Sequence, residues 1–257
     1  MGCCRKHRQP ELRGGNPLSE WVIHAHHNAP MEAPTPQQLS QLPLFPLRSV
    51  LFPGGYLPLR IFEVRYLDMI GRSHKAGTPF GVVCLTQGRE VRSAPGSAGA
   101  PSVYSDESFH AEGTLATITR LERPHPGLIT ICSTGTQRFR IRSSERLKHG
   151  LWVADVELLP QDMSVPVPDD LENAAFSLQE LVRGLSERAG DPAEMPLQPP
   201  YQWGDCGWLA NRWCELLPLD ADQKQRLMSL DNPLLRLELV SDLLQHMGLD
   251  QPAAGAS

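Results

Sequence analysis

The lysines and glycines of this chain do not form the common nucleotide-binding or proteolytic motifs. A phosphate-binding loop ends in Gly-Lys-Ser/Thr, because backbone N–H groups cradle the phosphates while the lysine neutralises them. No glycine in this sequence is followed by lysine. The chain has few lysines that could act as the base of a serine–lysine dyad: Lys6, Lys75, Lys148 and Lys224. We therefore expect neither an ATPase nor a serine–lysine protease.

Motifs for metal or nucleophilic chemistry are missing as well. HExxH and GxSxG do not occur, and Gly96-Ser97-Ala98-Gly99 lacks the flanking strand and helix of a nucleophile elbow. The six cysteines form no CxxC pair, which argues against a disulfide framework or a zinc ribbon. Cys84 and Cys132 lie in apolar runs and should be buried. We expect no metal, no cofactor and no enzyme activity.

An enzyme whose site is assembled from scattered residues stays open as an alternative. Asp106, Glu107 and Glu112 flank one loop, for example, and could converge in space. Solvated carboxylates at a surface loop explain the same pattern. A linear motif cannot distinguish the two interpretations.

Composition and charge describe a globular chain with two unlike halves. The 257 residues are 40% hydrophobic, enough for one large or two modest domains. No stretch reaches the roughly 18 apolar residues of a membrane span, and the first thirty residues lack a secretory signal, so we expect a cytoplasmic protein. Residues 42–159 carry 14 Lys+Arg against 10 Asp+Glu, whereas residues 160–249 carry 6 against 15. This shift predicts a domain boundary near Pro160.

The first half is typical of a small β domain behind an irregular leader. Residues 1–41 lack apolar periodicity and should be disordered. Residues 42–47 and 56–62 contain prolines, which favour edge strands joined by a tight turn at Pro53-Gly54-Gly55. A helix is expected from Glu63 to Lys75, with Gly77 as its stop signal. Further strands are predicted at 80–85, 113–121, 128–133, 137–141 and 151–159, with a long loop over 92–106. A single helix among so many strands favours a closed or nearly closed barrel over 42–159.

The second half has a helical pattern. Prolines mark a linker over 160–168, and a helical bundle should follow over 169–248, with a disordered tail over 249–257. Asp169-Asp170 are expected to cap a first helix that ends near Gly190. The second helix should run from Cys206 to Leu217. Asp220 with Gln223 predicts a capping box for the third, and Asp231 or Asn232 should begin a fourth that reaches Met247.

Several runs resemble the amino-terminal domain of Lon-type ATP-dependent proteases. They are Leu42-Pro43-Leu44-Phe45-Pro46-Leu47-Arg48, Val50-Leu51-Phe52-Pro53-Gly54 and Leu57-Pro58-Leu59-Arg60-Ile61-Phe62-Glu63, with Arg65-Tyr66-Leu67. Phe80-Gly81-Val82, Gly113-Thr114, Gly135 with Arg138-Phe139-Arg140-Ile141, Trp208-Leu209 and Glu215-Leu216-Leu217-Pro218-Leu219 follow in the family's order. The resemblance covers about residues 40–248. It implies an α+β fold, with a PUA-like pseudo-β-barrel containing one helix followed by a four-helix bundle.

The resemblance also implies a function, recognition of unfolded or client polypeptides. Because the sequence contains no ATPase or protease motif, we expect a stand-alone recognition module, with a separate protease or chaperone as a possible partner. Much of the signature should be structural: Leu59, Ile61 and Phe62 are expected in the core, and Glu63 should pair with Arg60 or Arg65. The candidate client-binding residues are Phe45, Phe52, Pro53, Tyr56 and Arg60, where prolines and glycines would leave a backbone edge open to an extended client.

RNA binding is the main alternative, because PUA-like barrels commonly bind RNA. Alternation along a strand would place Arg138, Arg140 and Arg142 on one face as a phosphate-binding stripe. A solvated outer face explains the same spacing. We expect nucleic acid to be the less favoured partner and expect no membrane association.

Overall fold

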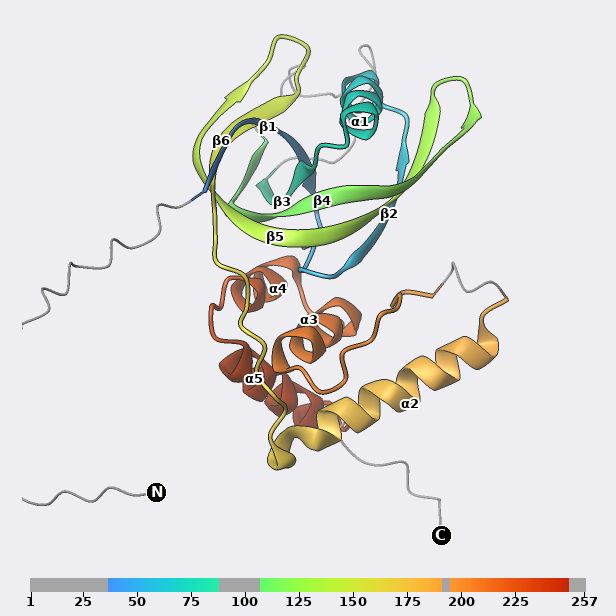
Figure 1. Cartoon of the computed structure of the whole chain (residues 1–257), viewed down its shortest axis with the longest axis vertical. Helices are drawn as coiled ribbons and strands as arrows, with labels where there is room; N and C mark the ends of the chain where they lie inside the picture. Colours follow the sequence, from blue (N-terminus) through green and yellow to red (C-terminus); the bar gives the residue numbers. More distant parts are fainter. Residues whose placement is uncertain (1–36, 88–106, 191–194, 250–257) are drawn as a thin grey trace, which may run out of the picture. The chain divides into compact units, whose positions relative to one another are not determined.

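The computed structural model describes residues 37–87, 107–190 and 195–249. These residues form an α+β structure in which one mixed sheet and helix α1 precede the remaining helices (Figure 1). In the described part of the chain, no helix is both long and apolar enough to cross a membrane. The expectations for residues 1–36, the loop over 92–106 and residues 250–257 lie outside the described residues.

The sheet has six strands, five of which pair with one another in a ring. They are β1 (Gln38–Leu47), β2 (Tyr56–Ile61), β3 (Phe80–Gln87), β4 (Ser108–His125), β5 (Leu128–Arg146) and β6 (Trp152–Leu158). Their order is β2-β5-β4-β3-β1-β6, and β6 also pairs with β5. Five strands therefore form a ring of pairings, while β2 is attached to β5 alone among the described strands.

The prediction that residues 42–47 form an edge strand is wrong. Strand β1 pairs in parallel with β3 and antiparallel with β6, so it lies inside the sheet. Along a strand, backbone groups point alternately to the two neighbours, so Pro43 and Pro46 each remove one donor from one ladder and leave the others intact. The strand also begins at Gln38, earlier than the predicted Leu42. The edge position of β2 agrees with the prediction.

The turn between β1 and β2 lies directly on the middle of β5. Gly54 has a φ of 74° and donates from its N–H to the carbonyl of Gly135 at 2.8 Å, and Gly135 donates to the carbonyl of Gly55 at 2.8 Å. A Cβ on Gly135 would lie 2.3 Å from the carbonyl oxygen of Phe52. Glycine is required at 135 because backbone occupies the space of a side chain. β5 continues through this point as one strand, where the sequence analysis predicted two.

Helix α1 (Val64–Ala76) begins three residues after β2 ends and ends where the sequence predicted. Gly77 adopts a left-handed φ of 65° and its N–H donates to the carbonyls of His74 and Ser73, which terminates the helix. Tyr66, Met69 and Ile70 pack into the sheet core with residues such as Phe45, Phe80 and Ile131. Arg65 pairs with Glu63 at 3.0 Å, which is one of the two pairings predicted for Glu63.

The C-terminal helices differ in how their N-termini are capped. α2 (Glu172–Arg188) follows the 3-10 helix Asp169–Leu171, so the predicted capping by Asp169 and Asp170 is wrong: these residues are inside that 3-10 turn, and no side chain caps α2. Asp205 caps α3 (Cys206–Leu216), and Asn232 caps α5 (Pro233–His246). The predicted capping box of Asp220 and Gln223 is present at α4 (Ala221–Met228).

A separate apolar core holds these helices together. α3 is buried on nearly every side, and its Trp213 donates from Nε1 to the carbonyl of Ala174 on α2 at 2.9 Å. Leu237, Val240 and Leu244 of α5 pack into the same core. Phe52, which precedes β2, is fully buried in this helical core and not in the core of the sheet. The turn between β1 and β2 is thus the place where the two parts of the fold interlock.

Candidate functional site

The aromatic residues proposed for client contact are placed in two different cores. Phe45 is only 8% exposed and stacks on Tyr66 with 4.2 Å between ring centroids. Phe52 is 0% exposed in the helical core. The expectation that these two side chains are exposed is wrong. A local apolar run cannot distinguish a surface anchor from a core residue, because burial depends on segments distant in sequence.

Tyr56 and Arg60 remain on the edge strand. The Tyr56 hydroxyl is partly buried and donates to Sγ of Cys132 on β5 at 2.8 Å. Cys132 and Cys84 are buried, as predicted. Arg60 is exposed near the end of β2. Pro53 is not on the strand edge, because it lies in the preceding turn, where α3 holds its carbonyl.

A shallow apolar hollow lies where β1, β2 and α1 meet. Its cavity of about 100 Å³ is lined by residues of these three elements and of the connection between β2 and α1: Phe45, Leu47, Leu59, Arg60, Ile61, Phe62, Glu63 and Tyr66. Phe62 is 55% exposed at its rim, which corrects the expectation that it lies in the core. Val64, the first residue of α1, is 77% exposed. Phe62, which was expected in the core, and Val64 thus present two apolar side chains to solvent at the start of α1.

The same face continues under the hairpin between β4 and β5. A second hollow there is lined by Leu67 of α1, by Leu128 and Ile129 of β5, and by the hairpin residues 123–127. Ile129 pairs in register with Ile61 at the end of β2. Ile61 lines the first hollow and Ile129 the second, so the two hollows are lined by neighbouring strands. We call Phe62, Val64, Leu67 and Leu128, the at least partly exposed apolar residues near these hollows, the apolar face. Figure 1 shows β2, α1 and this hairpin next to one another.

A buried ion-pair network fixes the beginning of α1. Arg65 is bonded to Glu63 at 3.0 Å and to Glu107 at 3.2 Å, and its Nη1 donates to the carbonyl of Gly150 at 2.8 Å. Burial acts to lower the pKa of Arg65, but its interactions with Tyr66, Glu107 and Glu63 outweigh this effect and raise the pKa. Because Arg65 is bound on several sides, the rim residues Phe62 and Val64 are presented on a rigid support.

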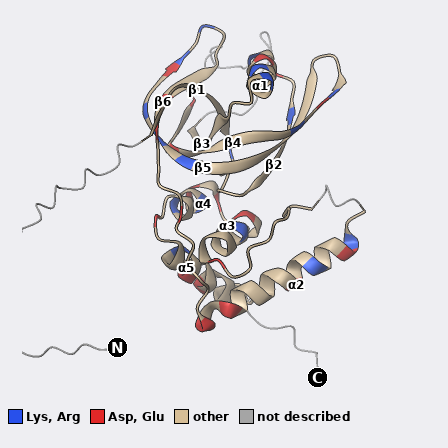
Figure 2. Cartoon of the chain, viewed as in Figure 1, with Lys and Arg blue, Asp and Glu red and all other residues tan. Residues whose placement is uncertain are grey.

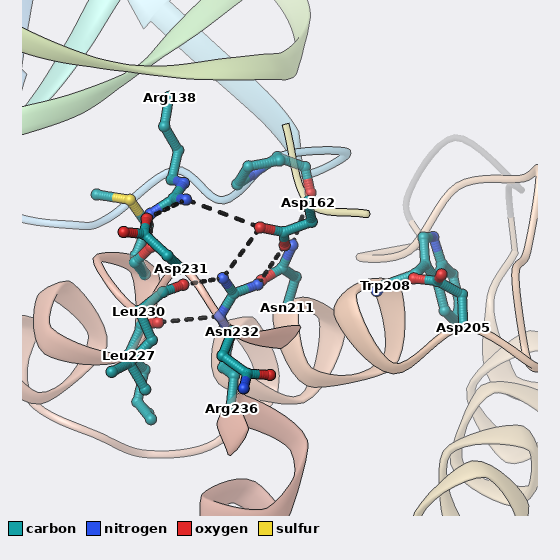
Figure 3. Close-up of polar contacts among 12 residues, drawn as sticks. Arg138, Asp162, Asp205, Trp208, Asn211, Leu227, Leu230, Asp231, Asn232 and Arg236 are labelled. Atoms are coloured by element: carbon teal, nitrogen blue, oxygen red, sulfur yellow. Dashed lines mark hydrogen bonds and ion pairs between the residues drawn. The ribbon is translucent and has the colours of Figure 1, made fainter. Parts of the chain in front are cut away.

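A polar junction joins the sheet to the helices (Figure 3). We define it as Arg138 of β5, Asp162 between β6 and the 3-10 helix, Asn211 of α3, Asp231 in the turn between α4 and α5, and Arg236 of α5. Arg236 is 1% exposed and donates to Asp162 at 2.6 Å and to Asn211 at 2.9 Å. Arg138 donates to Asp231 at 2.8 Å and lies 3.7 Å from Asp162. A cavity of about 310 Å³ opens beside it, with Trp208 in its wall. The charged groups are satisfied by one another, which makes this junction a structural joint.

The sequence model of the ATP-dependent protease La (LON) substrate-binding domain matches residues 41–246. The chain belongs to this family. It is 27% identical over 208 residues to the Lon protease of Anaeromyxobacter dehalogenans (strain 2CP-C) and 26% identical over 209 residues to Lon protease 2 of Myxococcus xanthus. Each match covers 79% of this chain and 23% of the relative, so the chain spans about a quarter of the length of these proteases.

A solved structure agrees on the fold. A crystal structure of a Lon N-terminal domain protein from Xanthomonas campestris aligns with a TM-score of 0.59 at 27% identity. The alignment covers 79% of this chain and 98% of that chain. The family resemblance and the α+β class expected from the sequence are therefore confirmed.

Within this Lon-family fold, the predicted arginine stripe is not a free cationic surface. Arg138 is 3% exposed and belongs to the polar junction, so the prediction that it lies on the outer face is wrong. Arg140 pairs with Glu112 at 2.7 Å, and Arg142 pairs with Glu157. A phosphate would have to displace a carboxylate at each of the two exposed positions, which weakens the case for RNA.

The carboxylates considered for chemistry do not converge in this Lon-family chain. Glu107 is bound to Arg65 and to Nε1 of Trp152 at 2.8 Å, whereas Glu112 pairs with Arg140 on a neighbouring strand. In the described residues, no group of three His, Cys, Asp or Glu side chains is arranged to hold a metal ion. Asp106 lies outside the described residues.

Sequence reasoning missed Phe62 and Val64 as surface residues of the Lon-family domain. Both sit in an apolar pattern that is equally compatible with a core strand and a core helix. One signal was available: Phe62 directly follows Ile61 and precedes a charged helix start, so the two cannot both face inward across the end of a strand. The exposure of Val64 had no comparable signal, because an apolar residue in the first turn of a helix is compatible with a buried or an exposed position.

Proposed function

We propose that this chain binds unfolded or extended client polypeptides, without catalysing a reaction, through the apolar face at the β2–α1 connection. The exposure of Phe62 and Val64 beside the hollow under β1 carries this proposal. Large apolar side chains gathered on one surface, and supported by a rigid framework, favour contact with apolar segments of another chain. Membership in a substrate-binding domain family supports the same function.

The edge strand β2 supplies the second part of the proposed site. It has one partner among the described strands, and its far end leads directly into Phe62. An extended client that lies along this strand would gain main-chain hydrogen bonds, while its apolar side chains contact the hollow. Pro58 lacks an N–H and therefore limits continuous pairing, which favours weak and promiscuous binding over stable strand addition. Arg60, exposed beside the hollow, would add affinity for acidic clients.

The finer architecture is part of the same proposal. The ring of strand pairings supports a PUA-like pseudo-β-barrel over 42–159, and the shared apolar core supports a four-helix bundle over 169–248, with 160–168 as the linker. In this scheme the barrel presents the client site and the bundle supports the turn that leads to β2. A separate protease or chaperone would receive the bound client.

Binding of a permanently unfolded polypeptide tests this proposal. The chain is titrated into a fluorescent, reduced and carboxymethylated protein at low and high salt, and in parallel into a structured RNA. We expect saturable polypeptide binding that survives high salt, because apolar contacts are screened little. F62S/V64S should weaken it about tenfold, as expected for removal of central apolar contacts.

The matched control is Met163→Ser in the linker. Met163 is 79% exposed, so this variant also removes an exposed apolar side chain, but outside the apolar face. We expect its affinity for the polypeptide to equal that of the unmodified chain. Equal losses in M163S and F62S/V64S would contradict the assignment of the site. Salt-sensitive binding of RNA alone would instead establish the nucleic-acid alternative, with Arg140 and Arg142 as its residues.

A further inference from the structure

Helix α5 has leucines on opposite faces. Its inner face, with Leu237, Val240 and Leu244, is fully buried in the helical core. On its outer face Leu235 is 41% exposed, Leu239 is 39% exposed and Met247, directly after the helix, is 40% exposed. A helix that serves only to cover a core carries polar residues on its solvent face. The outer leucines of α5 are therefore not explained by the packing of this chain.

The exposed apolar residues form a continuous stripe. Leu235, Leu239, partly buried Leu243 and Met247 are spaced by four, which places them along one side of a helix. We call these four residues the α5 stripe. Single exposed leucines are common on protein surfaces, but an aligned row is typical of an interaction surface. The helix has 14 residues and is thus about 21 Å long, which suits a partner helix of about four turns.

Apart from His246, the exposed ionisable residues of α5 are acidic. Glu238 and Asp242 are exposed next to the leucines, whereas Arg236, the helix's one basic residue apart from His246, is buried in the polar junction. Figure 2 shows further carboxylate residues where α2 begins. Residues 160–249 as a whole carry 6 Lys+Arg against 15 Asp+Glu. A second copy of this chain would bring like charges together, which disfavours self-association through this face.

We propose that the α5 stripe is a docking site for an amphipathic helix of a partner protein whose apolar side is flanked by lysine or arginine. The leucines of the partner would pack between Leu235, Leu239 and Met247, in the helix-to-helix geometry of apolar stripes. Its basic residues would pair with Glu238 and Asp242 at the rim. This surface is separate from the apolar face at β2 and α1, so its occupant and the client are bound by different residues.

A designed peptide tests the docking site on the full chain. The probe is a fluorescent helical peptide of about 18 residues with leucines on one side and lysines on the other. One comparison peptide replaces its lysines with glutamate, and another scrambles the same composition. We expect saturable binding of the lysine peptide alone, weakened by salt because rim charges contribute.

Two variants of the stripe or its rim and two controls locate the binding. L235Q/L239Q should lower the affinity for the lysine peptide about tenfold, since both central apolar contacts are lost. E238Q/D242N should lower this affinity severalfold. Leu181→Gln is the matched control, because Leu181 is a leucine 38% exposed on α2. It should bind as the unmodified chain does, and so should F62S/V64S. Glutamine is a good helix former, so α5 should stay folded, which circular dichroism verifies.

Equal affinity of L235Q/L239Q and the unmodified chain would overturn the proposal, because the peptide would then be held by the general acidity of the surface. Absence of lysine-peptide binding would overturn it too. Concentration-dependent dimers that disappear in L235Q/L239Q, measured by sedimentation, would assign the stripe to a second copy of this chain and equally exclude the proposed occupant.

Discussion

Arg212 of α3 donates from Nη2 to the main-chain carbonyl of Pro53 at 2.9 Å. The same guanidinium also bonds the carbonyl of Gly54 and lies 3.0 Å from Glu215. Since Pro53 and Gly54 form the turn that leads into β2, a helix far along the sequence holds the strand at which we place the client. The stability of this contact should therefore affect both the fold and client binding.

Removing Arg212 should be strongly destabilising. In R212M the carbonyl of Gly54 loses the bond from Arg212, and that of Pro53 keeps only the longer bond of 3.5 Å from Asn211. Glu215 is left without its ion-pair partner in a site where its side chain is only 18% exposed. We expect a loss of about 3–5 kcal/mol in the free energy of unfolding, measured by urea denaturation. R212M/E215L should lose less than R212M, because no buried carboxyl group without its partner remains. A double variant no more stable than R212M would contradict this explanation.

Glu215 should make stability depend on pH. Burial raises its pKa from 4.5 to about 7, despite the opposing effects of Arg212 and Lys224. Between these values the folded chain binds more protons than the unfolded chain, so the free energy of unfolding should fall as pH rises from 4.5 to 7. The contribution of this group is at most about 3 kcal/mol. E215Q should flatten the profile in this window; an unchanged slope would show that another group titrates.

Gly135→Ala tests the close approach of the β1–β2 turn to β5. The new Cβ would lie 2.3 Å from the carbonyl oxygen of Phe52, so backbone must move. We expect a loss of about 2 kcal/mol or more in the free energy of unfolding, because overpacking against backbone cannot be relieved by a rotamer change. The control is Gly184→Ala on α2, where nothing lies within 4 Å. It should stabilise the chain by about 0.5–1 kcal/mol through helix propensity.

Phe52 and Phe62 should respond oppositely to truncation. F52A leaves a cavity in the helical core and should cost about 3–5 kcal/mol in thermal or urea unfolding. F62A removes a side chain that is 55% exposed and should change the free energy of unfolding by less than about 1 kcal/mol. It should nevertheless weaken the binding of the unfolded client polypeptide. Loss of client binding in F62A together with an equally large loss of stability would argue that Phe62 is a core residue.

Local signals in the sequence were sufficient for the element ends that depend on near neighbours. Gly77 terminates α1 because a left-handed residue is required there, and Asp220 with Gln223 caps α4 through hydrogen bonds three residues apart. The family, the α+β class and the edge position of β2 also followed from the residues. Each of these features is determined by interactions within a few positions or by a dense motif.

The environment of the client candidates could not be predicted in the same way. Phe45, Phe52 and Phe62 occur in similar Pro- and Leu-rich runs, yet they lie in the sheet core, in the helical core and on the surface. Arg138 and Arg140 share one strand and differ again, because only Arg138 bonds to the end of α4 and to the turn that follows it. Strand alternation predicts which face a side chain is on, but not which distant helix covers that face.

The sequence by itself therefore determined the family, the order of strands and helices and most of their ends, since these depend on local propensity and capping. Only the tertiary structure decided that Phe52 joins the helical core, that Arg138 and Arg212 hold the two parts together, and that Phe62, Val64 and the α5 stripe remain exposed. The reason is physical: burial and ion pairing depend on segments far apart in the sequence, 93 residues for Arg138 and Asp231 and 159 for Arg212 and Pro53, and no local pattern encodes which of them will meet.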